Sequence, residues 1–96
     1  MTVSGQLRID LAHGEASLGE RALKLERRPL HMLQLLASRP GEVVGRAELL
    51  ERVWGTNYAG FEHSVEQAAH QIRRALKDPA WIETVRGIGY RFVAQP

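Results

Sequence analysis

The sequence predicts a single α+β domain over residues 1–96, with an N-terminal antiparallel sheet, three helices and a C-terminal β-hairpin. Residues 61–77 give the first observation behind this prediction. Their apolar side chains recur at the spacing of one helix face, at Val65, Ala69, Ile72 and Leu76. The second observation is residues 81–93, where two short strand-like runs flank a turn that contains Gly87 and Gly89. We expect both glycines to provide the positive φ of a tight turn.

The composition is that of an ordinary globular protein. Hydrophobic residues make up 44% of the chain, charged residues 25%, and the formal net charge is +2. This surplus is too small to indicate a nucleic-acid partner by itself. Cysteine is absent, which excludes disulfides and cysteine-ligated metal. The chain has neither an apolar run of roughly 20 residues nor the apolar region of a secretion signal, so we expect a cytoplasmic protein.

Short strands are expected at the N-terminus, between residues 6 and 25. Leu7 and Ile9 alternate with polar neighbours, which is the period of a half-buried strand. Turn residues then separate three predicted strands, at 6–10, 15–18 and 21–25. We expect this antiparallel sheet to cover the helical core.

Two helices are expected before residues 61–77. Residues 27–38 place four apolar side chains on one face, at Leu30, Leu33, Leu36 and Ala37. Val43 and Val44 form a short apolar link to residues 46–54. This second helix directs its apolar side chains inward, at Leu49, Leu50, Val53 and Trp54, and the glycine at position 55 is a favourable stop.

The polar side of helix 61–77 is the candidate binding surface. Its outward residues are His63, Ser64, Gln67, His70, Gln71, Arg73 and Arg74. Glutamine suits a bidentate contact with adenine, and arginine suits guanine or phosphate, so such a helix fits the major groove of DNA. Arg86 lies where the hairpin turns, from which its guanidinium can reach a phosphate or a narrow minor groove. The alternative is that the polar side of the helix is only a solvated face.

Four segments resemble one family. IRRAL at 72–76, DP at 78–79 and IETVRGIGYRF at 82–92 resemble the end of an OmpR/PhoB-type winged helix-turn-helix domain, and PGEVVGRAELLERVWG at 40–55 matches its first helix-turn-helix helix. The resemblance implies a DNA-binding domain of a bacterial transcription regulator, such as a two-component response regulator or a one-component or freestanding regulator. It implies that Thr84 and Tyr90 contact the DNA backbone beside Arg86. A sheet-stabilising role for Thr84 and Tyr90 is the alternative.

The resemblance also implies partners. In the family the loop at 55–61 can touch RNA polymerase, so Thr56, Asn57 and Tyr58 are a candidate partner surface. Members often bind direct repeats as dimers. The sequence departs from the family pattern at five positions, where Glu26 and Pro29 replace a Thr–Glu capping box and Ala68, His70 and Gln71 replace a more basic helix face.

The departures keep a second class of function open. Cations and acids balance along residues 61–78, which favours a protein-interaction module that docks to RNA polymerase or another regulator. His63 and His70 lie seven positions apart, too far for the usual chelating pair at i and i+4. We expect no metal, no cofactor and no enzyme activity, since no nucleophile, base or carboxylate pair is suitably arranged.

Overall fold

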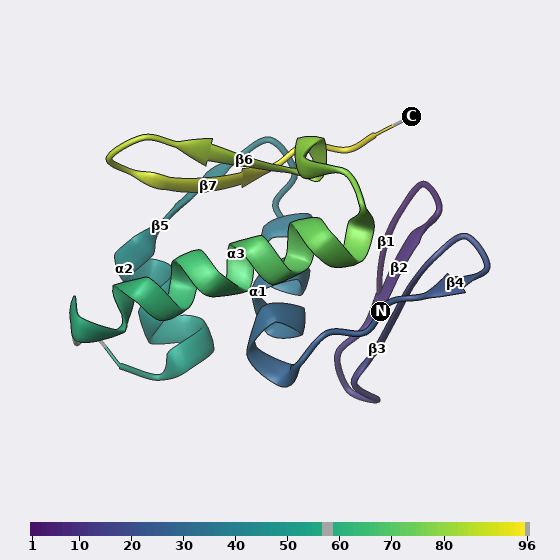
Figure 1. Ribbon diagram of the computed structural model, residues 1–96, viewed down its shortest axis with the longest axis horizontal. Helices are drawn as coiled ribbons and strands as arrows, with labels where there is room; N and C mark the ends of the chain where they lie inside the picture. Colours follow the sequence, from purple (N-terminus) through teal and green to yellow (C-terminus); the bar gives the residue numbers. More distant parts are fainter. Residues whose placement is uncertain (57–58, 96) are drawn as a thin grey trace.

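The computed structural model describes residues 1–56 and 59–95 and confirms the predicted α+β fold class (Figure 1). Three helices pack together. A four-stranded N-terminal sheet lies at one end of them, and a three-stranded sheet that includes the C-terminal hairpin lies along one side. The apolar side chains of the helices and of both sheets meet in one continuous core.

The N-terminal sheet is a meander in which each strand pairs antiparallel with the next. Its strands are β1 (Thr2–Ser4), β2 (Leu7–Asp10), β3 (Glu15–Leu18) and β4 (Arg21–Ala22). Leu7 and Ile9 are fully buried, as their alternation predicts. The sequence missed β1. The prediction that the third strand continues to residue 25 was wrong, because the chain leaves the sheet after one last bond from Leu23 N to Ala16 O (2.9 Å) and crosses to the first helix.

The first helix, α1 (Arg27–Ala37), buries all four residues predicted for its inner face. Ser38, which the prediction included, is the residue that ends it. Glu26 precedes the helix and makes no side-chain cap, in agreement with the missing capping box. The second helix begins as α2 (Arg46–Leu49) and continues as a π-helical turn, Leu50–Trp54. Gly55 ends it with a φ of +70°, as the sequence predicts.

The predicted link at Val43 and Val44 was wrong, because these residues form a strand, β5 (Val43–Gly45). This strand pairs antiparallel with β7 (Gly89–Phe92), which also pairs with β6 (Ile82–Val85), so the order is β5-β7-β6. A short 3₁₀ turn, Pro79–Trp81, leads into β6. The rings of Trp81 and Phe92 pack at 5.7 Å and join the hairpin to the core.

The two glycines of the hairpin have different functions. Gly87 has a φ of +75° and makes the turn, as predicted. Gly89 does not have a positive φ, so that part of the prediction was wrong. A Cβ atom at Gly89 would lie 2.0 Å from the carbonyl oxygen of Val44, so the missing side chain lets β5 approach β7.

Candidate nucleic-acid interface

The candidate recognition helix is α3 (Glu62–Leu76), which a 3₁₀ turn at Ala59–Phe61 precedes. It begins one residue later than predicted. Lys77, which we expected to be helical, ends it in the left-handed conformation, with φ +59°. Its buried face comprises Val65, Ala68, Ala69, Ile72 and Leu76, which includes the whole predicted stripe.

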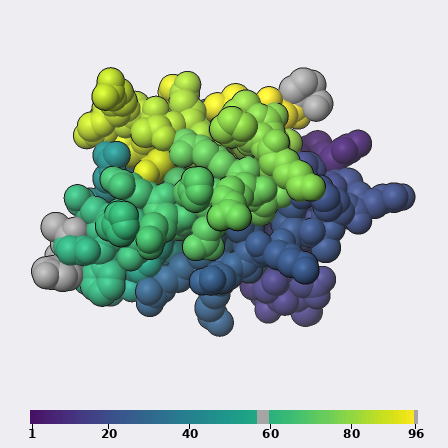
Figure 2. Space-filling view, in the orientation of Figure 1, coloured from purple at the N-terminus to yellow at the C-terminus, as the bar shows by residue number. Residues whose placement is uncertain are grey.

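The opposite side of α3 is a polar stripe, formed by the exposed residues His63, Gln67, His70 and Arg74. Their spacing of four, three and four residues keeps them within about 60° of one another around the helix axis. This spacing sets them opposite the buried face. Figure 2 shows α3 in green across the middle of one face of the molecule, with the hairpin in yellow above it. The stripe is therefore presented to solvent beside the hairpin.

Arg73 does not belong to this stripe, although it was among the predicted outward residues. It is half-buried, and its Nε and Nη2 atoms donate to the carbonyl oxygen of Ile82 at 3.1 and 2.7 Å. Nη2 also donates to Oγ1 of Thr84 at 2.8 Å. Two of the predicted DNA-contact residues, Arg73 and Thr84, thus bond to each other and join α3 to β6. Ser64 and Gln71 are also half-buried, on the flank of α3 that faces α1.

The hairpin of β6 and β7 presents Arg86 at its exposed turn. Ile88 beside it is 57% exposed, so the tip carries one cation and one apolar side chain. Tyr90, in contrast, is 3% exposed and belongs to the core, which favours the sheet-stabilising role. The guanidinium of Arg46 lies over its ring, 5.7 Å from the ring centre. This contact of Arg46 was not predicted from the sequence, because its partner is 44 positions away in the chain.

The N-terminal sheet contacts α3 through Arg21. Its Nη1 atom donates to the carbonyl oxygen of Ala75 at 2.7 Å, and Nη2 donates to that of Leu76 at 3.4 Å. These carbonyls lie at the C-terminal end of α3, where a helix has no further N–H groups to pair with them and where a cation is favourable. Arg21 therefore fixes the end of the candidate recognition helix, which sequence spacing did not predict.

An ionic network links the chain after α1 to the second helix. Glu48 accepts a hydrogen bond from Arg39 at 2.6 Å and pairs with Arg52 at 2.9 Å. The bond from Arg39 is the main reason that the pKa of Glu48 is lowered, although partial desolvation opposes it. A bond to His13 lowers the pKa of Asp10 in the same way. Both carboxylates lie outside the polar stripe, so these are structural ion pairs.

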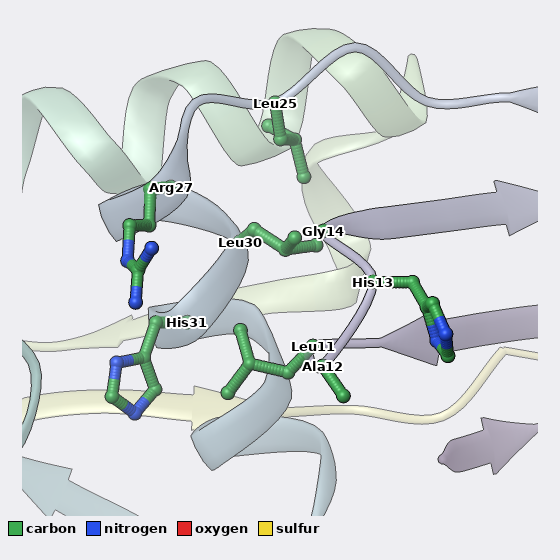
Figure 3. A pocket seen from close by; sticks show the side chains of 8 residues that line it. All are labelled: Leu11, Ala12, His13, Gly14, Leu25, Arg27, Leu30 and His31. Carbon is green, nitrogen blue, oxygen red and sulfur yellow. The ribbon is translucent and has the colours of Figure 1, made fainter.

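A cavity of about 720 Å³ lies between the β2–β3 turn and the start of α1. Figure 3 shows Arg27 and His31 side by side on α1, one turn apart, with their side chains directed away from α3. Leu11, Leu25 and Leu30 supply its apolar lining. This cavity is separate from the polar stripe.

Only part of the predicted partner loop lies within the described residues. Thr56 is half-buried, and its N–H donates to the carbonyl oxygen of Leu50 at 3.1 Å. Asn57 and Tyr58 lie outside the described residues. No group of three or more His, Asp or Glu in residues 1–56 and 59–95 is arranged to hold a metal ion. None of the helices described is both long and apolar enough to cross a membrane.

An exposed helix joined to a hairpin wing, above two packed helices, defines the winged helix-turn-helix class. Comparison with known proteins gives the family. Residues 19–92 match the model described as "Transcriptional regulatory protein, C terminal". The chain belongs to this family of OmpR/PhoB-type domains, as its sequence motifs predict.

Individual relatives agree with this assignment. The chain is 35% identical to transcriptional regulatory protein HprR of Escherichia coli and 32% identical to heme response regulator HssR of Staphylococcus epidermidis. These matches cover 98% and 91% of this chain but only 43% and 40% of the relatives. The chain thus spans less than half the length of these relatives.

Two solved structures are similar over almost the whole chain. The DNA-binding domain of CpxR from E. coli is 30% identical, with a TM-score of 0.86, and the match covers 100% of this chain and 99% of that one. The RstA DNA-binding domain of Klebsiella pneumoniae, solved in complex with the RstA box, is 33% identical, with a TM-score of 0.83 and coverage of 95% and 94%.

Proposed function

We propose that this chain is the sequence-specific DNA-binding domain of a bacterial transcription regulator. In this proposal α3 enters the major groove of double-stranded DNA, and the wing contacts the neighbouring phosphate backbone or minor groove. The observation that carries the proposal is the polar stripe of α3, exposed on the same face as the tip of the wing. The RstA relative, solved with its DNA box, supports it.

Each residue of the interface has a distinct expected role. Gln67 is exposed in the middle of the stripe, and an amide there suits a bidentate contact with adenine. His63, His70 and Arg74 flank it and face the bases or the groove walls. Ser64 and Gln71 lie at the side of the helix and are expected at the edge of the groove. Arg86 at the wing turn is expected on phosphate or in the minor groove.

Arg73, Thr84 and Tyr90 act mainly by positioning the wing in this proposal. Arg73 and Thr84 already bond to each other, and Tyr90 is in the core. Thr84 is exposed, and its hydroxyl, which accepts from Arg73, can still donate its own proton to a phosphate.

Selection from a random-sequence duplex pool, followed by a salt titration, tests the proposal. We expect an enriched half-site and an affinity that falls as salt rises. Arg86→Ala is expected to weaken binding to most sequences alike, whereas Gln67→Ala is expected to change which sequence is preferred. If neither variant differs from the unchanged chain on the enriched duplex, α3 and the wing do not lie where we propose.

A protein-docking module is the second candidate, and the charges of α3 favour it. Glu62 and Glu66 are exposed at the N-terminal end of the helix, and His63 lies 3.9 Å from Glu66. Acids there reduce the number of phosphates that the helix can approach. A pool without enrichment, even at low salt, would favour docking, and RNA polymerase at Thr56 and the following loop would then be the partner to test.

We further infer that the domain acts in the cytoplasm and that it binds repeated half-sites as pairs. Both inferences rest on the family and on its response-regulator relatives. Sedimentation of the chain with duplexes that carry one or two copies of the enriched half-site tests pairing: tighter binding per site on the duplex with two copies supports it.

A further inference from the structure

The flank of α3 that faces away from the wing lies beside two cations from another part of the chain. Gln71 and Arg73 are two residues apart and therefore about 200° apart around the helix. Arg73 bonds to the wing, so Gln71 lies on the opposite flank. The segment that leads into α1 lies along this flank, and in Figure 2 it is the blue chain below the green helix.

Lys24 in that segment and Arg28 in the first turn of α1 border hollows that they share with α3. Lys24 lines a hollow of about 270 Å³ together with Gln71, Arg74 and Ala75. No acidic residue of the described part of the chain lines this hollow, so its two cations and one amide all favour an anion. Arg28 lines a second hollow of about 140 Å³, nearer the middle of α3, which it shares with Gln67 and Gln71. Among the residues that the structure describes, Glu26 is the one acid that lines this second hollow.

These cations are available for binding. Lys24 and Arg28 are exposed, and within residues 1–56 and 59–95 neither side chain makes a hydrogen bond or an ion pair. Several other cations of the chain are already engaged, since Arg21, Arg39, Arg52, Arg73 and Arg91 each bond to a carboxylate or a carbonyl oxygen. Lys24 and Arg28, around the start of α1, therefore supply part of the unpaired positive charge beside the stripe.

The geometry of an α-helix in the major groove of DNA brings phosphates close to this positive charge. An α-helix with its side chains is about 10–12 Å across and nearly fills a major groove about 12 Å wide. The two phosphate backbones then run along both flanks of the helix. The wing is placed to meet one backbone, and Lys24 and Arg28 are placed beside the other.

We propose that Lys24 and Arg28 form a second phosphate-binding site, which holds the DNA backbone on the side of α3 opposite the wing. This inference rests on the proposed DNA binding. The site is sequence-independent, because phosphate carries no base information. It supplies cations outside the helix, where the acids of α3 do not neutralise them.

The experiment compares Lys24→Gln and Arg28→Gln with Arg27→Gln in the 96-residue chain. Arg27 is the matched control, because it is an exposed arginine next in sequence to Arg28 but is directed away from α3, beside His31. Affinity for the fluorescently labelled enriched duplex is measured from about 50 to about 200 mM salt. Thermal unfolding of each variant confirms that the fold is intact.

Each substitution in the proposed site should reduce the slope of log affinity against log salt by about 0.9, and the double variant by about 1.8. The affinity ratio between the enriched and a shuffled duplex should not change, whereas Arg27→Gln should retain the original slope. If Arg86→Ala weakens binding but Lys24→Gln and Arg28→Gln behave as Arg27→Gln does, the second site is refuted and the proposed function stands. If the unchanged chain binds no duplex, both proposals are overturned.

Discussion

Gly89→Ala is the substitution whose effect the structure determines most directly. The new Cβ atom would lie 2.0 Å from the carbonyl oxygen of Val44 and 2.9 Å from the Cα atom of Gly45. Real Cβ contacts are essentially never below 3.0 Å, and both neighbours are backbone atoms that no rotamer change can move away. Strand β5 must therefore separate from β7 by about 1 Å or more, which lengthens the hydrogen bonds of a three-residue strand.

The expected loss follows from two terms. Overpacking against a fixed backbone costs about 1–3 kcal/mol, and each weakened hydrogen bond costs about 1 kcal/mol more. A total of about 3 kcal/mol is a large part of the roughly 5–14 kcal/mol expected for a chain of this size. It corresponds to a fall in Tm of about 12–24 °C.

Urea unfolding followed by tryptophan fluorescence measures this loss, because Trp81 is 6% exposed and packs on Phe92. Gly45→Ala is the matched control on the facing strand. Gly45 pairs with Gly89, has no positive φ, and a Cβ there would meet nothing closer than 3.8 Å. We expect the control to unfold within about 0.5 kcal/mol of the unchanged chain. Equal midpoints for the two variants would show that the close approach of β5 and β7 is not needed.

Three further substitutions test the contacts that hold α3 and the ion pairs. Arg73→Lys keeps the charge but cannot bond Ile82 and Thr84 together, so we expect a loss of about 1–2 kcal/mol in urea unfolding and weaker DNA binding through a displaced wing. Arg21→Ala removes two bonds to the end of α3 and should lower stability by about 1 kcal/mol in the same assay, with Arg8→Ala as a control. The lowered pKa of Glu48 contributes stability that is present above the ordinary glutamate pKa and lost as pH falls through the lowered value. When the pH is lowered from about 6 to about 3, the stability of the Glu48→Gln variant should therefore fall less than the stability of the unchanged chain.

The elements that could be predicted are those whose sequence pattern lies within a short stretch of the chain. The buried stripes of α1 and α3 recur every three or four residues, and the turn at Gly87 has its own residue requirement, so each can be seen within a short window. Strands β1 and β5 were missed because three residues are too few to establish an alternation. The partner of β5 lies about 45 positions further along the chain, and only tertiary pairing defines the strand.

The same distinction applies to the candidate site. Helical spacing placed His63, Gln67, His70 and Arg74 on the exposed side of α3, and the structure agrees. It also placed Ser64, Gln71 and Arg73 there, but these three are half-buried. Arg73 is about 100° from Arg74 around the helix axis, close enough to the wing for a long side chain to reach the carbonyl oxygen of Ile82. A pattern that divides residues into inward and outward cannot detect such a contact at the border.

The engagement of Arg73 changes how the charge of α3 should be counted. Formally the helix and its stop carry as many cations as acids, but one of these cations is held by the wing and is not available to phosphate. The free positive charge of the helix region is then Arg74 and Lys77, against the exposed Glu62, Glu66 and Asp78. Affinity for DNA must consequently depend on cations outside α3, at the wing tip and around the start of α1. Substitutions at Arg86, Lys24 and Arg28 should therefore reduce the salt dependence of binding more than any single substitution on the recognition helix does.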